Sequence, residues 1–130
     1  MSIEIEVANL LQADAGVAAI APTINMEFVH EQNATGPQIV ITRVSGNIEP
    51  ELDPANPWRR ARLQIDCYDD DYRKTKALAA AVESGFWAYQ GPAGSYQIDN
   101  VSLDNVSDLS ERDSDKIDRR VSLDFLVLYQ

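Results

Sequence analysis

Apolar residues recur every three to four positions at the start of the chain. A helix with 3.6 residues per turn gathers such positions on one face. The residues that fit this spacing are Ile3, Val7, Leu10 and Leu11. Ser2 suits the N-cap, the pattern is interrupted at Gly16, and Pro22 stops further helix. The sequence therefore predicts a first helix from Ser2, a break near Gly16 and one short helical turn after it.

Strict alternation of apolar and polar residues marks the strands. The clearest run, 59–68, places every second residue on one apolar face: Ala61, Leu63, Ile65 and Cys67. Residues 121–129 alternate equally well, and weaker patterns cover 23–29 and 95–106. In the last of these the apolar positions change parity between Ile98 and Val101, which predicts a β-bulge. Residues 39–45 are β-branched and mostly apolar, which predicts a more central strand.

Three consecutive aspartates separate the 59–68 strand from a second helical pattern that extends from Asp70 to Phe86. We expect Asp69 or Asp70 to be the N-cap, because aspartate accepts the free N–H groups of a first turn. The apolar stripe of this helix, which we expect to face the core, consists of Tyr72, Ala79, Val82 and Phe86. Strands that follow one another without helices favour antiparallel pairing. The predicted fold is a single α+β domain over 1–130, a mainly antiparallel sheet of about five strands with two principal helices on one face.

The net charge of −10 argues against a protein that binds free nucleic acid, because such binding needs lysine and arginine to replace phosphate counterions. No apolar run approaches the roughly 20 residues that span a bilayer, so we expect no membrane association. The N-terminus lacks the basic region of a secretory signal and the single cysteine has no intrachain partner, so a reducing compartment is expected.

Two groups of residues could carry chemistry. The run Asp69–Asp71 resembles a metal or acid/base site, but a metal loop would need alternating ligands and a glycine, so capping is the preferred interpretation. His30 is the only histidine, and Cys67 falls on the apolar face of its strand, where a small buried side chain is the usual role. The common phosphate-binding, hydrolase and zinc motifs do not occur. We therefore expect no catalytic residues, no metal and no cofactor.

A long loop without periodicity extends from Gly46 to Pro57 and leads into Trp58-Arg59-Arg60. Loops of this length are usually functional, and tryptophan and arginine are enriched in interfaces. The alternatives are an ordinary hairpin loop and arginines on a solvated sheet face. The candidate oligomer or partner interface consists of Ile48, Glu49, Glu51, Leu52, Asp53, Trp58, Arg59 and Arg60.

Four segments together resemble the bacteriophage tail-terminator or tail-completion family. The opening "VANLLQADAGVAAIAPTI" is similar to its first helix and entry into a strand, and "GPQIVITRVSG" to its second strand. "ARLQIDCYDDDYRKTKALAAAVESGF" resembles its join of a strand to a helix, and "DRRVSLDFLVLY" its last strand. The length and proline content of the 46–57 loop depart from the family pattern.

The resemblance implies a structural virion protein and not an enzyme. Such proteins form rings, commonly hexameric, on the tail tube, stop its polymerisation and meet the head connector. The implied partners are further copies of the chain, the major tail tube protein and the head-completion protein, with assembly in the host cytoplasm.

DNA would pass through the lumen of such a ring without specific binding, because an acidic wall disfavours adhesion. Acids that could face a lumen are Asp66, Asp108, Glu111, Asp113 and Asp115. The alternatives are another neck or head-closure protein and, in different classes, a small ligand-binding module or an enzyme that uses His30 and Cys67.

Overall fold

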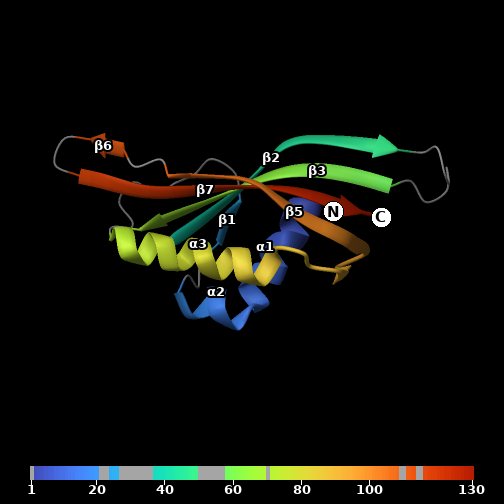
Figure 1. The fold of residues 1–130 in the computed structure, drawn as a ribbon. Helices are drawn as coiled ribbons and strands as arrows, with labels where there is room; N and C mark the ends of the chain where they lie inside the picture. The colour runs from blue at the N-terminus through green and yellow to red at the C-terminus, as the bar shows by residue number, and fades with distance from the viewer. Residues whose placement is uncertain are drawn as a thin grey trace.

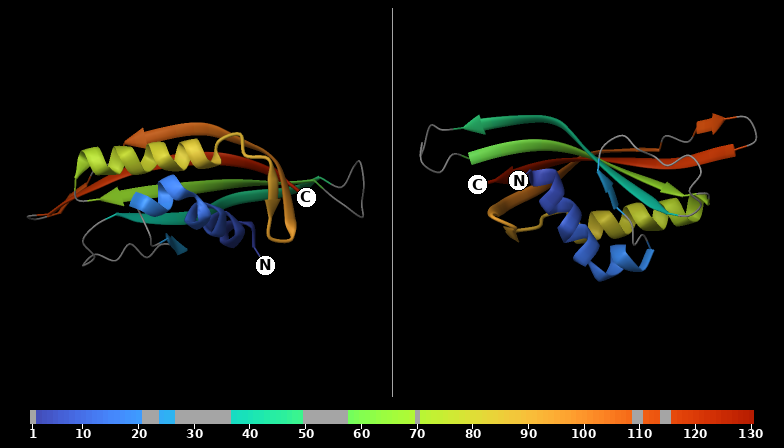
Figure 2. Two further views of the ribbon diagram at one scale, coloured as in Figure 1. Left: turned by 90° about the horizontal axis from the view of Figure 1, so that it is seen from below. Right: turned by 180° about the vertical axis from the view of Figure 1, so that it is seen from behind.

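The computed structural model describes residues 2–20, 24–26, 37–49, 58–69, 71–108, 111–113 and 116–130. A curved sheet forms one layer. Helices α1 and α3 lie against one of its faces, and α2 packs against these two helices on the same side (Figure 1). Seen from below, the helices lie side by side across that face (Figure 2). The predicted α+β class, with helices on one face of a mainly antiparallel sheet, is confirmed.

Four long strands make up most of the sheet. They are β2 (Gln38–Glu49), β3 (Trp58–Asp69), β5 (Tyr96–Asp108) and β7 (Lys116–Tyr129). Three short strands join them: β1 (Ile24–Met26), β4 (Gly91–Ala93) and β6 (Glu111–Asp113). The strand order is β1-β2-β3-β7-β5-β4, and β6 pairs with β7. Every pairing is antiparallel except that of β1 with β2, which is parallel.

The helices are α1 (Ile3–Ala13), α2 (Ala15–Ile20) and α3 (Tyr72–Phe86). The break after α1 lies at Asp14 and not at Gly16 as predicted. The Asp14 carboxylate accepts the Val17 N–H at 3.0 Å, and its carbonyl accepts the Ala18 N–H at 2.9 Å. Asp14 thus ends one helix and caps the next. The prediction was wrong because it assigned the break to the glycine instead of to the capping aspartate.

The core fills the space between the helices and the sheet. The predicted alternation on β3 is confirmed, because Ala61, Leu63, Ile65 and Cys67 are fully buried. Opposite them, α3 buries Leu78, Val82 and Phe86. The Phe86 and Phe125 rings meet edge to face, with their centroids 5.0 Å apart, and join α3 to the middle of β7.

Strand β2 is longer than its sequence pattern. The alternation is lost after Arg43 because the register with β3 shifts between Arg43 and Ser45, which leaves Val44 as the extra residue of a bulge. Pairing then continues to Glu49, opposite Trp58. The segment 46–49, predicted to be loop, is therefore strand. The bulge predicted in β5 is confirmed, with register shifts between Ile98 and Asn100 and again between Leu103 and Asn105.

Strands β4 and β5 form a tight hairpin that the sequence showed only as a break. Ala93 pairs with Tyr96, so two residues make the turn, and Gly94 has a φ of +61°. Two-residue hairpin turns require positive φ, which glycine adopts without strain. A β-carbon at Gly94 would also collide with the carboxylate of Glu6 on α1.

Candidate partner interface

The residues of the candidate interface are concentrated in a hairpin arm, which we define as residues 43–49 of β2 with 58–62 of β3. Ile48 pairs with Arg59, and Glu49 with Trp58. Pairing of β3 with β7 begins only at Arg59, opposite Tyr129. In Figure 1 the ends of β2 and β3 extend past the C-terminus of the chain. Glu51, Leu52 and Asp53 lie outside the described residues, as do the side chains of Ile48 and Glu49.

Two arginines of the arm lie on the helix-bearing face. Arg43 is opposite Leu63 and Arg59 is opposite Tyr129, and both of these partners are core residues. The Arg43 guanidinium lies over Gly46, where a β-carbon would collide with it. Burial raises the pKa of the Tyr129 phenol, and the nearby charges of Arg43 and Arg59 act in the opposite direction. The arm therefore places positive charge on the helix side of the sheet edge.

Arg62 lies on the other face and is paired with acids, as the alternative interpretation of these arginines predicted. Its guanidinium lies 3.0 Å from an Asp124 carboxylate oxygen and 2.9 Å from one of Asp104. The side-chain hydrogen bond to Asp124 is the main cause of a raised pKa for Arg62. The pairs link β3 through β7 to β5, so Arg62 fixes the sheet rather than offering a free cation.

The aspartate run has a different cap from the one predicted. Asp71 is the N-cap of α3, and its carboxylate accepts the Arg73 N–H at 2.8 Å. Asp69 is buried at the end of β3 and accepts the Asp71 N–H at 3.5 Å. The assignment of the cap to Asp69 or Asp70 is therefore wrong: β3 extends through Asp69, and Asp70 lies outside the described residues. No group of three or more metal-ligating side chains occurs among the residues that the structure describes.

Replacing Asp71 by alanine should lower the free energy of unfolding by about 0.5–2 kcal/mol, because the first turn of α3 loses its side-chain acceptor. Asp71→Ser, which keeps an acceptor, is the matched control and should lower the free energy of unfolding by only a few tenths of a kcal/mol. Urea denaturation followed by circular dichroism measures both. Equal losses for the alanine and serine variants would contradict the assignment of the cap.

Helix α3 is attached to β5 at both of its ends. At the N-terminal end, the Tyr72 hydroxyl donates to Asp108 at 2.5 Å, and the Lys76 ammonium lies 3.5 Å from the same carboxylate. At the C-terminal end, the Ala88 N–H donates to the Val101 carbonyl at 2.9 Å. Tyr72 is 42% exposed, so the prediction that it faces the core is wrong. It belongs to a second stripe of α3 that faces the outer edge of β5.

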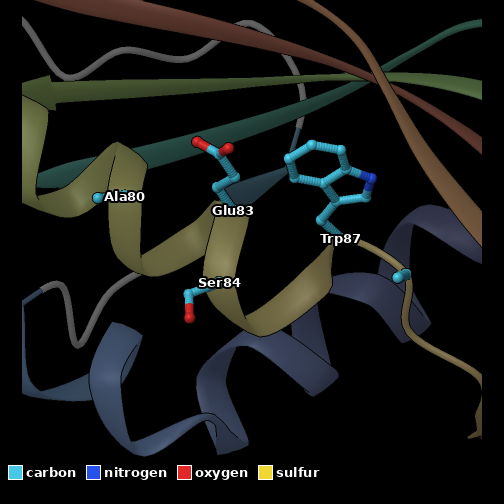
Figure 3. A pocket seen from close by; sticks show the side chains of 5 residues that line it. Ala80, Glu83, Ser84 and Trp87 are labelled. Atoms are coloured by element: carbon cyan, nitrogen blue, oxygen red, sulfur yellow. The ribbon is translucent and has the colours of Figure 1, made fainter.

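That stripe ends in an exposed tryptophan. Trp87 follows the last residue of α3 and is 51% exposed. It lines a hollow of about 460 Å³ together with Ala80, Glu83, Ser84 and Ala88. Figure 3 shows Glu83 and Trp87 extending from the same side of the helix, whereas Ser84 extends from another. We call this side, formed by Lys76, Ala80, Glu83 and Trp87, the α3 flank.

The sequence interpretation missed the α3 flank. A signal was available, because Trp87 lies four residues after Glu83 and is off the apolar stripe that contains Phe86. The backbone of Ala88 also marks this site, but this feature is visible only in the structure. Its φ of +61° is a left-handed conformation that glycine usually occupies after a helix.

Comparison with known proteins now decides the family. The family model described as "Tail completion protein gp17" matches residues 5–130. The chain belongs to the tail completion protein gp17 family. It therefore has a structural role in a phage tail and is a component of a virion or virion-like particle. No curated protein matches the chain.

Among solved structures, a chain from "Virion of native gene transfer agent (GTA) particle" matches with a TM-score of 0.74 at 18% identity. The match covers 98% of this chain and 94% of that one. At this identity the likeness concerns the fold. The α+β fold of this chain is thus also found in a chain of a gene transfer agent particle.

The structure gives no support to the enzyme alternative, which would use Cys67 and His30. Cys67 is fully buried on the core face of β3, and burial raises the pKa of its thiol far above the usual range. A buried, protonated thiol is not a nucleophile. His30 lies outside the described residues. The helices of the described part are also too short or too polar to cross a membrane.

The acids suggested for a lumen are not equivalent. Asp66 is only 5% exposed and accepts a hydrogen bond from the Gln64 side-chain amide at 3.0 Å. It is therefore not a candidate for an acid that faces a lumen. Asp108 is held by Tyr72 and Lys76. Glu111 and Asp113 belong to β6, whose side chains are not described, and Asp115 lies outside the described residues.

Proposed function

We propose that this tail completion protein forms a ring, most simply a hexamer, on the last ring of the tail tube. There it stops polymerisation of the major tail tube protein and presents a surface to the head-completion protein. The observation that carries the proposal is the family match over residues 5–130, which is nearly the whole chain.

The shape of the domain supports ring formation. A ring needs a heterologous contact, in which two different surfaces of one chain meet on neighbouring copies, with a rotation that closes. The hairpin arm offers the outer edge of β2 at one side of the sheet, and at the opposite side β4 covers only residues 96–98 of β5. The interface residues Trp58, Arg59 and Arg60 would then contact a neighbour or a stacked ring.

The charge of the chain supports passage of DNA through such a ring. The net charge of −10 gives a surface that repels phosphate, so DNA could move through the lumen without adhering. A sequence-specific nucleic-acid contact would require a basic patch. Two of the described cations, Arg62 and Lys76, are instead paired with carboxylates.

The proposal predicts that the purified protein binds tails at a single end. Tails from an infection that lacks the protein would be mixed with gold-labelled protein and viewed by negative-stain electron microscopy. We expect label at the head-proximal end, because only the last ring of the tube exposes the surface to which this protein would bind. Tail-less heads are the matched control: label on their portals and not on tails would favour the alternative of a head-closure protein.

A further inference from the structure

We propose that the outer edge of β5 and the α3 flank receive the outer edge of β2 from a second copy of the chain. This inference rests on the proposed ring and names the two surfaces that meet in it. The β2 edge comprises residues 42–49, and the β5 edge comprises residues 102–108.

Both edges are open in the part of the chain that the structure describes. Strand β1 pairs with β2 only at Ile39–Ile41, so no described strand lies beside residues 42–49. Strand β4 pairs with β5 only at Tyr96–Ile98, and the Ala88 N–H donates to the Val101 carbonyl. No described strand lies beside residues 102–108 on that side. Unpaired strand edges carry rows of free N–H and C=O groups and readily accept another strand.

The strand directions of the two edges are compatible. From β2 to β3, β7 and β5 there are three antiparallel steps, so β2 and β5 of one chain have opposite directions. When β2 of a second copy in the same orientation continues the sheet beyond β5, the new pair is antiparallel. The helix-bearing faces of the two copies then lie on the same side.

This arrangement brings opposite charges together. Arg59 of the arm lies on the helix-bearing face, and the same face beside the Val101 end of β5 carries Glu83 and Trp87 on the α3 flank. A guanidinium is attracted both by a carboxylate and by the face of an indole ring. The small side chain of Ala80 leaves the hollow open beside Trp87, so a long arginine side chain has room to enter.

Exposed apolar residues mark the same two edges. Val44, at the bulge of β2, is 54% exposed, and Val106 on β5 is 47% exposed. With Trp87 they make up three of the five large hydrophobic residues that are exposed in the described part. Joining the edges would remove these side chains from water, which favours association.

The positions of the edges also constrain the ring. Residues 42–49 lie toward the arm end of the sheet, whereas residues 102–108 lie toward the end at which α3 begins. Pairing them shifts each copy along the strand direction. A closed ring then requires strands that are inclined to the ring axis, as in a β-barrel.

Crosslinking between introduced cysteines tests the contact. The only native cysteine, Cys67, is fully buried and does not compete. The variant V44C/V106C would be bound to tails that lack the protein and treated with a short bis-maleimide. We expect a ladder of crosslinked multimers, because each copy offers both sides of the contact, and only dimers when the two single variants are mixed.

The matched control is V44C/I5C, because Ile5 is 48% exposed but belongs to α1 and to neither of the two proposed edges. This control should give no ladder. A ladder as strong as that of V44C/V106C, or no ladder from V44C/V106C on tails that have bound the protein, would overturn the inference and leave the proposed function standing. Failure of the protein to bind tails at all would instead overturn the proposed function.

A charge exchange gives an independent result. R59E should reduce ring formation by about tenfold or more, because a like charge then faces Glu83. E83R should do the same alone, and the combination R59E/E83R should restore ring formation. Light scattering of the assembled species measures each variant. Losses that simply add in the combination would contradict the pairing of these two residues.

Discussion

Replacing Phe125 by alanine is expected to lower the free energy of unfolding by about 3–5 kcal/mol, the range for removing a fully buried aromatic ring. Phe125 lies in the middle of β7, between β3 and β5, where it pairs with Leu63 on one side and Leu103 on the other. Its ring also meets that of Phe86 at a centroid distance of 5.0 Å. Loss of the ring leaves a cavity where the sheet and α3 join.

A loss of this size is a large part of the total stability, because small domains are stable by only about 5–15 kcal/mol. Urea denaturation followed by circular dichroism measures it. Leu128→Ala is the matched control, because Leu128 lies on the other face of β7 and is only partly buried. Similar losses for the two variants would contradict the assignment of the core to the helix-bearing face.

The long elements could be predicted from the sequence because their patterns result from burial on one face. The alternation of Leu63 with Gln64 and of Phe125 with Asp124 places β3 and β7 correctly. The change of parity between Ile98 and Val101 located a real bulge. In each case the side chains of a single element carry the information.

Strands β4 and β6 and the end of β2 could not be predicted in this way. Strands β4 and β6 have three residues each and exist because a longer neighbour pairs with them. Residues 46–49 lose their alternation at the bulge near Val44, although the backbone pairing continues. Backbone pairing across a sheet leaves little trace in the composition of a short segment.

Of the two surfaces that we propose to meet, only one is visible in the sequence. The segment around Trp58 and Arg59 stands out by residue type, and the structure places it at the end of the hairpin arm. The opposite surface, with Trp87 and Val106, depends on two elements that are distant in the chain. Such a surface forms only when α3 packs beside β5, so the pattern within either element does not reveal it.

The second large effect concerns the tail itself. In an infection without this protein, the tail tube has no stop signal, and tube subunits continue to add. We therefore expect tails of widely scattered and excessive length, without attached heads, and a loss of infectious particles by several orders of magnitude. Supplying the wild-type protein from a plasmid should restore both length and head attachment.

The variant H30A/C67A is the control for the enzyme alternative. It should restore tails as well as the wild type does, because a structural protein needs neither an imidazole nor a thiol. A folded double variant that fails to restore tails would favour an enzymatic role. The Phe125→Ala variant, by contrast, should restore fewer tails, because it loses a large part of its stability.

The distribution of tail lengths, measured by electron microscopy in lysates with and without the protein, tests the central claim most directly. The proposed function predicts a narrow distribution with heads attached when the protein is present, and a broad, overlong distribution without heads when it is absent. Tails of normal length that carry heads in the absence of the protein would contradict it.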